Sequence, residues 1–155
     1  MVHAETVLLD QLLANANDES WYLSFEQVAD GIAEADAVWK PDENSHSIVE
    51  IVQHLIYWNE AWQVRYEKND VAAVPKIERN EDSFKYKEGS SYKELKEELL
   101  HVLLKWQHLL TAEKLEAEVP GYPVSAEWWG MIANLATHNA YHIGQIAYIK
   151  KIIKI

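Results

Sequence analysis

His138 and His142 are the residues of this 155-residue sequence whose spacing points most directly to chemistry. On an α-helix, residues four positions apart leave the same face about one turn from each other, so two imidazoles can reach one ion. Apolar residues recur at helical spacing around the pair, which predicts that both rings face the core; these residues are Met131, Leu135, Ile146 and Ile149. His54 has a similar place between Ile51 and Trp58 on another apolar stripe.

Three inward-facing histidines on two helices, with no partner carboxylate on those stripes, favour a shared divalent cation. Burial of an unsatisfied polar group costs about 1–3 kcal/mol, and one cation would satisfy all three rings. Three neutral imidazoles that leave one coordination position open are also typical of catalytic rather than structural zinc sites. Because imidazole must be neutral to coordinate, its ordinary pKa of ~6.5 predicts a metal affinity that falls between pH 7 and 5. Buried, hydrogen-bonded histidines without a metal remain the alternative.

The four remaining histidines carry weaker signals. His3 is near the start of the sequence, and His46 lies beside a predicted helix cap. His101 and His108 share a charged helical face, where we expect them to be solvated. Glu43 and His46 have the Glu-x-x-His spacing of di-iron bundles, but that site needs two such copies and two further inward-facing glutamates. A di-iron site is therefore excluded.

The periodicity of apolar residues predicts four helices and no strand, and these helices must position the histidines. We expect helices over residues 4–35 with a kink or a short break at 15–20, over 48–68, over 92–116, and from a cap at Ser125 to about 151. Capping boxes at Ser47–Glu50 and Ser91–Glu94 mark the starts of the second and third helices, because each serine can accept a hydrogen bond from the amide three residues on.

Four helices with one apolar stripe each predict an all-α four-helix bundle, in a single domain over residues 1–155. The connection between the second and third helices, residues 69–89, is longer than a tight turn needs. It can carry the chain back along the bundle as a long crossover loop, which gives an up-down-down-up order with these two helices parallel. Gly144 is expected to let a neighbouring helix approach the fourth helix closely.

The composition excludes several classes of function. With 14 basic and 25 acidic residues the net charge is −11, which argues against nucleic acid and anionic membrane surfaces as partners. The absence of cysteine excludes disulfides, thiolate metal ligands and cysteine nucleophiles. No apolar run is long enough to span a bilayer, and the first residues carry acids where a signal peptide needs a basic start. We therefore expect a cytoplasmic protein.

Two motifs together resemble those of a known family. The first consists of WKP at 39–41 and SHSIVEIVQHL at 45–55, and the second of VPGY at 119–122 and HNAYHIGQI at 138–146. They resemble the motifs of the DinB-like (YfiT-like) metal-dependent enzymes, and the resemblance covers essentially the whole chain. It implies a four-helix bundle of the up-down-down-up kind that binds a divalent nickel, zinc or iron ion through three histidines. By this resemblance, the three metal-binding histidines correspond to His54, His138 and His142 in this sequence.

The resemblance also implies an activity. Some relatives are thiol S-transferases that use bacillithiol, mycothiol or glutathione as cosubstrate, and others are hydrolases, so we expect one of these two reactions on a small molecule. The metal ion would act as a Lewis acid on a thiol or water. A metal-binding or interaction protein that keeps the bundle without the chemistry is the alternative. Asn139 departs from the family, in which many members have an acidic residue there, and this leaves catalytic competence open.

The aromatic residues add two expectations. Trp58, one turn beyond His54, is a candidate wall of the metal pocket, with plain core packing as the alternative. Trp128 and Trp129 are adjacent on a helix, so their side chains point roughly 100° apart and cannot both face one core centre. We expect one of them at a pocket mouth or a subunit contact, or covering a helix end. Members of the family are commonly dimers, and a homodimer is expected here.

Overall fold

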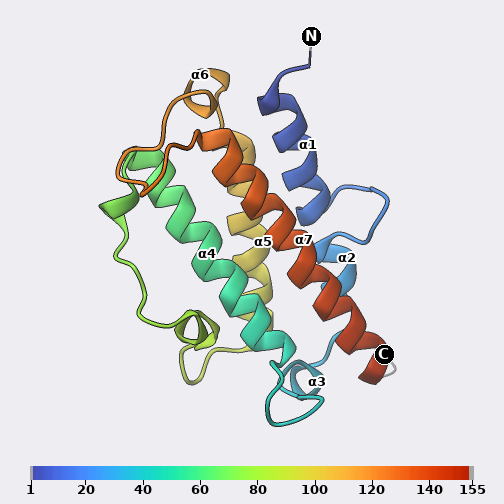
Figure 1. Ribbon diagram of the computed structural model, residues 1–155. Helices are drawn as coiled ribbons and strands as arrows, with labels where there is room; N and C mark the ends of the chain where they lie inside the picture. The colour runs from blue at the N-terminus through green and yellow to red at the C-terminus, as the bar shows by residue number, and fades with distance from the viewer. Residues whose placement is uncertain (1, 154–155) are drawn as a thin grey trace.

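The computed structural model describes residues 2–153, and every regular element in that range is helical (Figure 1). The α-helices are α1 (Ala4–Ala16), α2 (Phe25–Ala29), α3 (Glu34–Ala37), α4 (Ile48–Lys68), α5 (Tyr92–Leu109), α6 (Ala112–Leu115) and α7 (Trp128–Ile153). Two short 3₁₀ helices, η1 (Val71–Ala73) and η2 (Asn80–Phe84), lie in the connection between α4 and α5. The all-helical prediction is confirmed.

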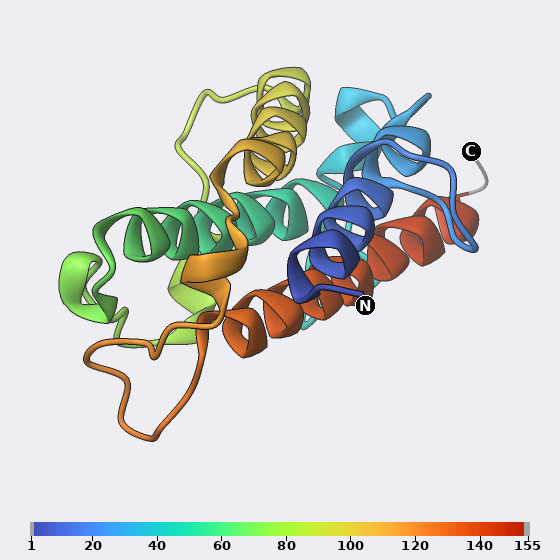
Figure 2. The same ribbon diagram turned by 90° about the horizontal axis from the view of Figure 1, so that it is seen from above.

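The four long helices α1, α4, α5 and α7 pack side by side around a shared core (Figures 1 and 2). In Figure 1, α4 and α5 run in the same direction, while α1 and α7 run in the opposite one. Side-chain hydrogen bonds join α4 to α5, from Gln63 to the carbonyl of Val102 at 2.7 Å and from Trp106 to Asn59 at 2.9 Å. The connection with η1 and η2 returns the chain along the outside of α4, which brings η2 next to the middle of the bundle.

Serine caps start three of the helices. The capping boxes predicted at Ser47 and Ser91 are both present, and each serine accepts a hydrogen bond from the amide of a glutamate three residues later. A third capping box, between Ser24 and Gln27, begins α2. These caps satisfy amides that the first helical turn leaves without partners, so they fix where the helices begin.

The predicted helix over residues 4–35 is wrong, because the chain leaves the helix after Ala16. Asn17 has an extended φ of −155°, and the short helices α2 and α3 follow a loop. A positive φ of 71° at Gly31 separates these two, a conformation that glycine adopts at little cost. The interruption expected in the Asn-rich segment as a kink or a short break is thus a break, and two short helices follow it in place of one resumed helix.

Two other helix boundaries also differ from the expectation. The third long helix ends at Leu109 instead of about residue 116, and the short α6 follows as a separate turn. The fourth begins at Trp128 rather than directly after Ser125, because an antiparallel bridge between Glu118 and Glu127 holds the preceding chain extended. For the fourth helix, pairing of the preceding chain across this bridge competes with continued helix, and helical periodicity alone does not contain this information.

The buried side chains form two apolar clusters along the bundle axis. One is built around Phe25, Leu55 and Ile143, and the other around Trp106 and Trp128. On α7 the polar residues His138, Asn139 and His142 lie between the two clusters in sequence, and His54 and Asn59 of α4 contact them. Within residues 2–153, no helix combines the length and apolar character needed to cross a membrane.

Candidate metal centre

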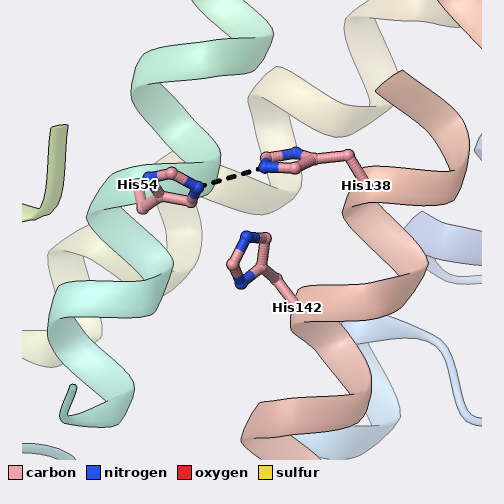
Figure 3. A group of neighbouring side chains, drawn as sticks. All are labelled: His54, His138 and His142. Atoms are coloured by element: carbon pink, nitrogen blue, oxygen red, sulfur yellow. Dashed lines mark hydrogen bonds between the residues drawn. The ribbon is translucent and has the colours of Figure 1, made fainter. Parts of the chain in front are cut away.

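His54 on α4 and His138 and His142 on α7 point toward one another across the interface of the two helices (Figure 3). One ring nitrogen from each residue lies within 4.8 Å of the corresponding nitrogens of the other two. The pair on α7 meets because its members are one turn apart, and its ring centroids are 4.5 Å from each other. His54 completes the group from the opposite helix, with its Nε2 atom 3.1 Å from Nε2 of His138.

The donor set fits a divalent cation. Two nitrogens that share a tetrahedral zinc ion at ~2.0–2.1 Å lie roughly 3.3 Å apart, close to the 3.1 Å between His54 and His138. Within residues 2–153, Nδ1 of His138 is also the only buried side-chain polar atom that lacks a hydrogen-bond partner. A cation at the Nε2 side would offset the cost of placing these three rings in a largely apolar interior.

The electrostatic environment keeps the three rings neutral. Burial, and then the neighbouring imidazoles with His142 first, lower the pKa of His54 to about 3. Burial and then the proximity of His142 lower the pKa of His138 to about 4. Burial also lowers the pKa of His142, against the effect of a hydrogen bond to Gln145. Near neutral pH all three therefore offer the unprotonated nitrogen that metal coordination requires.

Two polar residues outside the histidine set hold two of the rings. Nδ1 of His54 lies 2.6 Å from the hydroxyl of Ser83, which comes from η2 in the long connection. Nδ1 of His142 lies 2.6 Å from Oε1 of Gln145. Sequence reasoning missed both. The i+3 position of Gln145 on the same helix could have indicated its contact, whereas no signal in the sequence places Ser83 beside His54.

Phe84 follows Ser83 in η2 and is sandwiched between two imidazoles. Its ring stacks on His54 with centroids 3.9 Å apart and on His46 at 3.7 Å. His46 is half-buried, and its Nε2 atom lies 3.4 Å from a carboxylate oxygen of Glu81. The phenyl ring separates His46 from the cluster, so His46 is a packing partner of the site and not a fourth member of the histidine group.

A pocket of about 490 Å³ opens on one side of the cluster, and His138 forms part of its lining. Its other lining residues are Trp58, Trp62, Asn80, Tyr122, Met131, Asn134 and Leu135. Trp58 is half-buried and its ring meets His54 edge-on at 6.4 Å. Trp58 therefore lines this pocket, and it also packs against the apolar cluster around Trp106 and Trp128.

The comparisons with known proteins agree with this architecture. The sequence profile of the DinB superfamily matches residues 16–146. This chain belongs to the DinB superfamily. A crystal structure of a DinB-like protein, YjoA from Bacillus subtilis, is similar over 96% of this chain and 93% of its own, with a TM-score of 0.65 and 17% sequence identity. Among curated protein sequences, none matches the chain. The match in structure establishes a shared DinB-like helical fold.

Asn139, the position where many DinB-like sequences have an acid, does not bond to any of the three histidines. Its side chain is fully buried and forms a reciprocal amide pair with Asn59, with N···O distances of 2.8 and 3.0 Å. The indole of Trp106 also donates to Asn59, at 2.9 Å. In this DinB protein the residue therefore ties α7 to α4 and α5 next to the histidine layer.

For several other residues of this DinB protein, the structure can be compared with the sequence-based predictions. His3, His101 and His108 are exposed, as expected. The structural role predicted for Gly144 is wrong, because a methyl group at this position would meet no atom within 4 Å. Its helix face borders an open groove and not a neighbouring helix.

The adjacent tryptophans have different environments. Trp128 is buried and donates its indole N–H to Asn69 at 2.9 Å. Trp129 is 46% exposed at the start of α7, where its indole bonds to Glu127. Neither side chain borders the pocket beside His138. Trp129 consequently remains the member of the pair that a subunit contact could use.

Proposed function

We propose that this DinB-superfamily protein is a metal-dependent enzyme in which His54, His138 and His142 hold one divalent metal ion. The convergence of three neutral imidazoles beside a pocket lined by His138 carries the proposal. All-imidazole ligation suits zinc, nickel and iron, and availability decides among them. Three protein ligands also leave room for a further ligand, as in catalytic zinc sites.

A bound divalent ion supplies Lewis acidity, which lowers the pKa of a thiol or of water and so provides a nucleophile near neutral pH. The chain supplies the binding surface. Trp58, Trp62 and Leu135 give the pocket an apolar wall that excludes water and holds the body of a small molecule. The side-chain amides of Asn80 and Asn134 can orient polar groups of that molecule.

Thiol S-transfer is the reaction that this pocket supports best. The sulfur of a low-molecular-weight thiol would release its proton to solvent, form a bond to an electrophilic carbon, and displace a leaving group that departs with the bonding electrons. A free thiol has a pKa of ~8.5, far below the ~15.7 of bulk water, so a divalent ion needs to lower the pKa of a thiol much less than that of water to give a nucleophile near neutral pH. The pocket lining contains no carboxylate that could assist proton transfer from water or repel a thiolate.

An activity screen on metal-loaded protein tests the proposal. Zinc-, nickel- and iron-loaded samples would be assayed with bacillithiol, mycothiol or glutathione and a chromogenic electrophile, and separately with an activated ester. We expect thiol conjugation that disappears on chelation and in the His54→Ala variant, and that persists in His108→Ala, which removes an exposed histidine outside the site. Full metal occupancy without turnover would favour the non-catalytic metal-binding alternative and contradict the enzyme proposal.

A further inference from the structure

The hydrogen bonds around Ser83 determine which nitrogen of His54 carries the proton. Oγ of Ser83 lies 2.5 Å from the carbonyl oxygen of Asn80, and a carbonyl oxygen can only accept, so the single hydroxyl proton of Ser83 points there. Toward His54 the hydroxyl oxygen is left to accept. Nδ1 of His54, 2.6 Å away, must then be the N–H donor, and its Nε2 atom carries the free lone pair.

Gln145 has the same effect on His142. Its Oε1 atom is a carbonyl oxygen that only accepts, and it lies 2.6 Å from Nδ1 of His142. The proton of the neutral ring is therefore on Nδ1, and Nε2 of His142 is free. His138 differs from both, because its Nδ1 atom is buried without any partner.

We propose that Ser83 and Gln145 are positioning residues that select the Nδ1–H tautomers of His54 and His142 and so direct both Nε2 lone pairs to the metal site. His138 has no such residue at its Nδ1 atom, and in the metal-free protein its Nε2–H donates to the free Nε2 of His54, so its proton has to leave Nε2 before that nitrogen can bind a metal. His138 is also the histidine that lines the pocket. The effect of these residues on metal affinity rests on the proposed metal site. The tautomers themselves do not depend on a metal.

The geometry explains why these positions matter for affinity. In the opposite tautomer a ring would present an N–H toward the metal site, and the proton would have to move before coordination. A hydrogen bond at the other nitrogen also fixes the ring plane and raises the basicity of the ligand, and loss of such a partner typically weakens metal binding about 10–100-fold. Ser83 reaches His54 from η2, so the long connection between α4 and α5 contributes to a site whose ligands all lie on α4 and α7.

The first test reads the tautomers directly in chelator-treated protein. Two-bond ¹H–¹⁵N correlation spectra of histidine-labelled protein near pH 7 distinguish Nδ1–H from Nε2–H rings. We expect His54 and His142 to be Nδ1–H in the wild type, and His54 to gain Nε2–H population in Ser83→Ala. A wild-type spectrum in which either ring is mainly Nε2–H would overturn the assignment of Ser83 or Gln145 as acceptor.

The second test measures zinc dissociation constants with a competing chromogenic chelator. We expect Ser83→Ala and Gln145→Met each to weaken zinc binding about 10–100-fold while stoichiometry stays at one ion per chain. Gln145→Glu retains an acceptor and should bind zinc at least as tightly as the wild type. Ser90→Ala, a serine in the same connection with no contact to the cluster, is the matched control and should not change affinity.

The outcomes separate this inference from the proposed function. If the wild type and Ser83→Ala bind zinc equally tightly, the positioning role is wrong while the three-histidine site stands. If the wild type binds no zinc, the proposed function fails, and the tautomer spectra still test the hydrogen bonds. Circular dichroism of each variant excludes loss of helix as the cause of a weakened affinity.

Discussion

Acidification should destabilise the metal-free protein, and His54 should account for a measurable share of the loss. Its side chain is only 1% exposed, and burial lowers its pKa to about 3, whereas an unfolded chain has a histidine pKa of ~6.5. Between these values the unfolded state binds a proton that the folded state does not. The free energy of unfolding therefore falls as the pH drops through ~6.5, and it rises with pH over the same window.

The size of the effect follows from the two pKa values. At pH 5 the unfolded chain holds almost one full proton at this position, and integration from pH 7 to 5 gives a loss of about 2 kcal/mol for His54 alone. The lowered pKa values of His138 and His142 act in the same direction. A loss of 2 kcal/mol is a large fraction of the stability of an ordinary domain.

Urea denaturation of the metal-free protein at pH 7 and pH 5 measures this loss in the free energy of unfolding. We expect His54→Gln to lose about 2 kcal/mol less than the wild type over this interval, whatever its stability at pH 7. His108→Gln removes an exposed histidine and should lose as much as the wild type. Equal losses in wild type and His54→Gln would refute the conclusion that His54 is buried as a neutral ring.

Three further predictions concern the metal and the assembly. His54→Ala, His138→Ala and His142→Ala should each abolish stoichiometric metal binding with nearly unchanged helical content, because two protein ligands remain; near-full occupancy by elemental analysis would remove that residue from the ligand set. Metal affinity should change little between pH 7 and 5 and fall below pH 5, because burial puts the pKa values of His54 and His138 at about 3 and about 4; a steep fall between pH 7 and 6 in metal titrations would contradict this. We also expect a homodimer, with the exposed Trp129 as a candidate contact, and a light-scattering mass near 17.9 kDa would be that of a monomer and refute it.

The predicted pH window for metal binding shows what a sequence leaves undetermined. The ordinary histidine pKa places the loss of affinity between pH 7 and 5. In the folded protein burial removes the rings from water, so their charged forms are disfavoured and the pH window moves down. The shift depends on desolvation by segments far away in the sequence, which no local pattern encodes.

The sequence by itself determined the long helices, two of the capping boxes and the three histidines as one group. Each of these depends on residues within one element, or on the faces that helical periodicity gives them, so spacing is sufficient. The spacing of His138 and His142 on α7 and the apolar stripe around His54 were enough to predict that the rings would meet, and they do lie together.

Only the tertiary structure decided what surrounds the histidines. Ser83 is 29 positions from His54, and Asn139 is 80 positions from Asn59, so their contacts exist only once the long connection and α7 have packed against α4. The start of the fourth long helix likewise depended on the bridge between Glu118 and Glu127, which lies outside that helix. Local periodicity specifies which face of a helix is apolar, whereas packing between distant segments decides which polar groups are paired and how strongly burial changes their protonation.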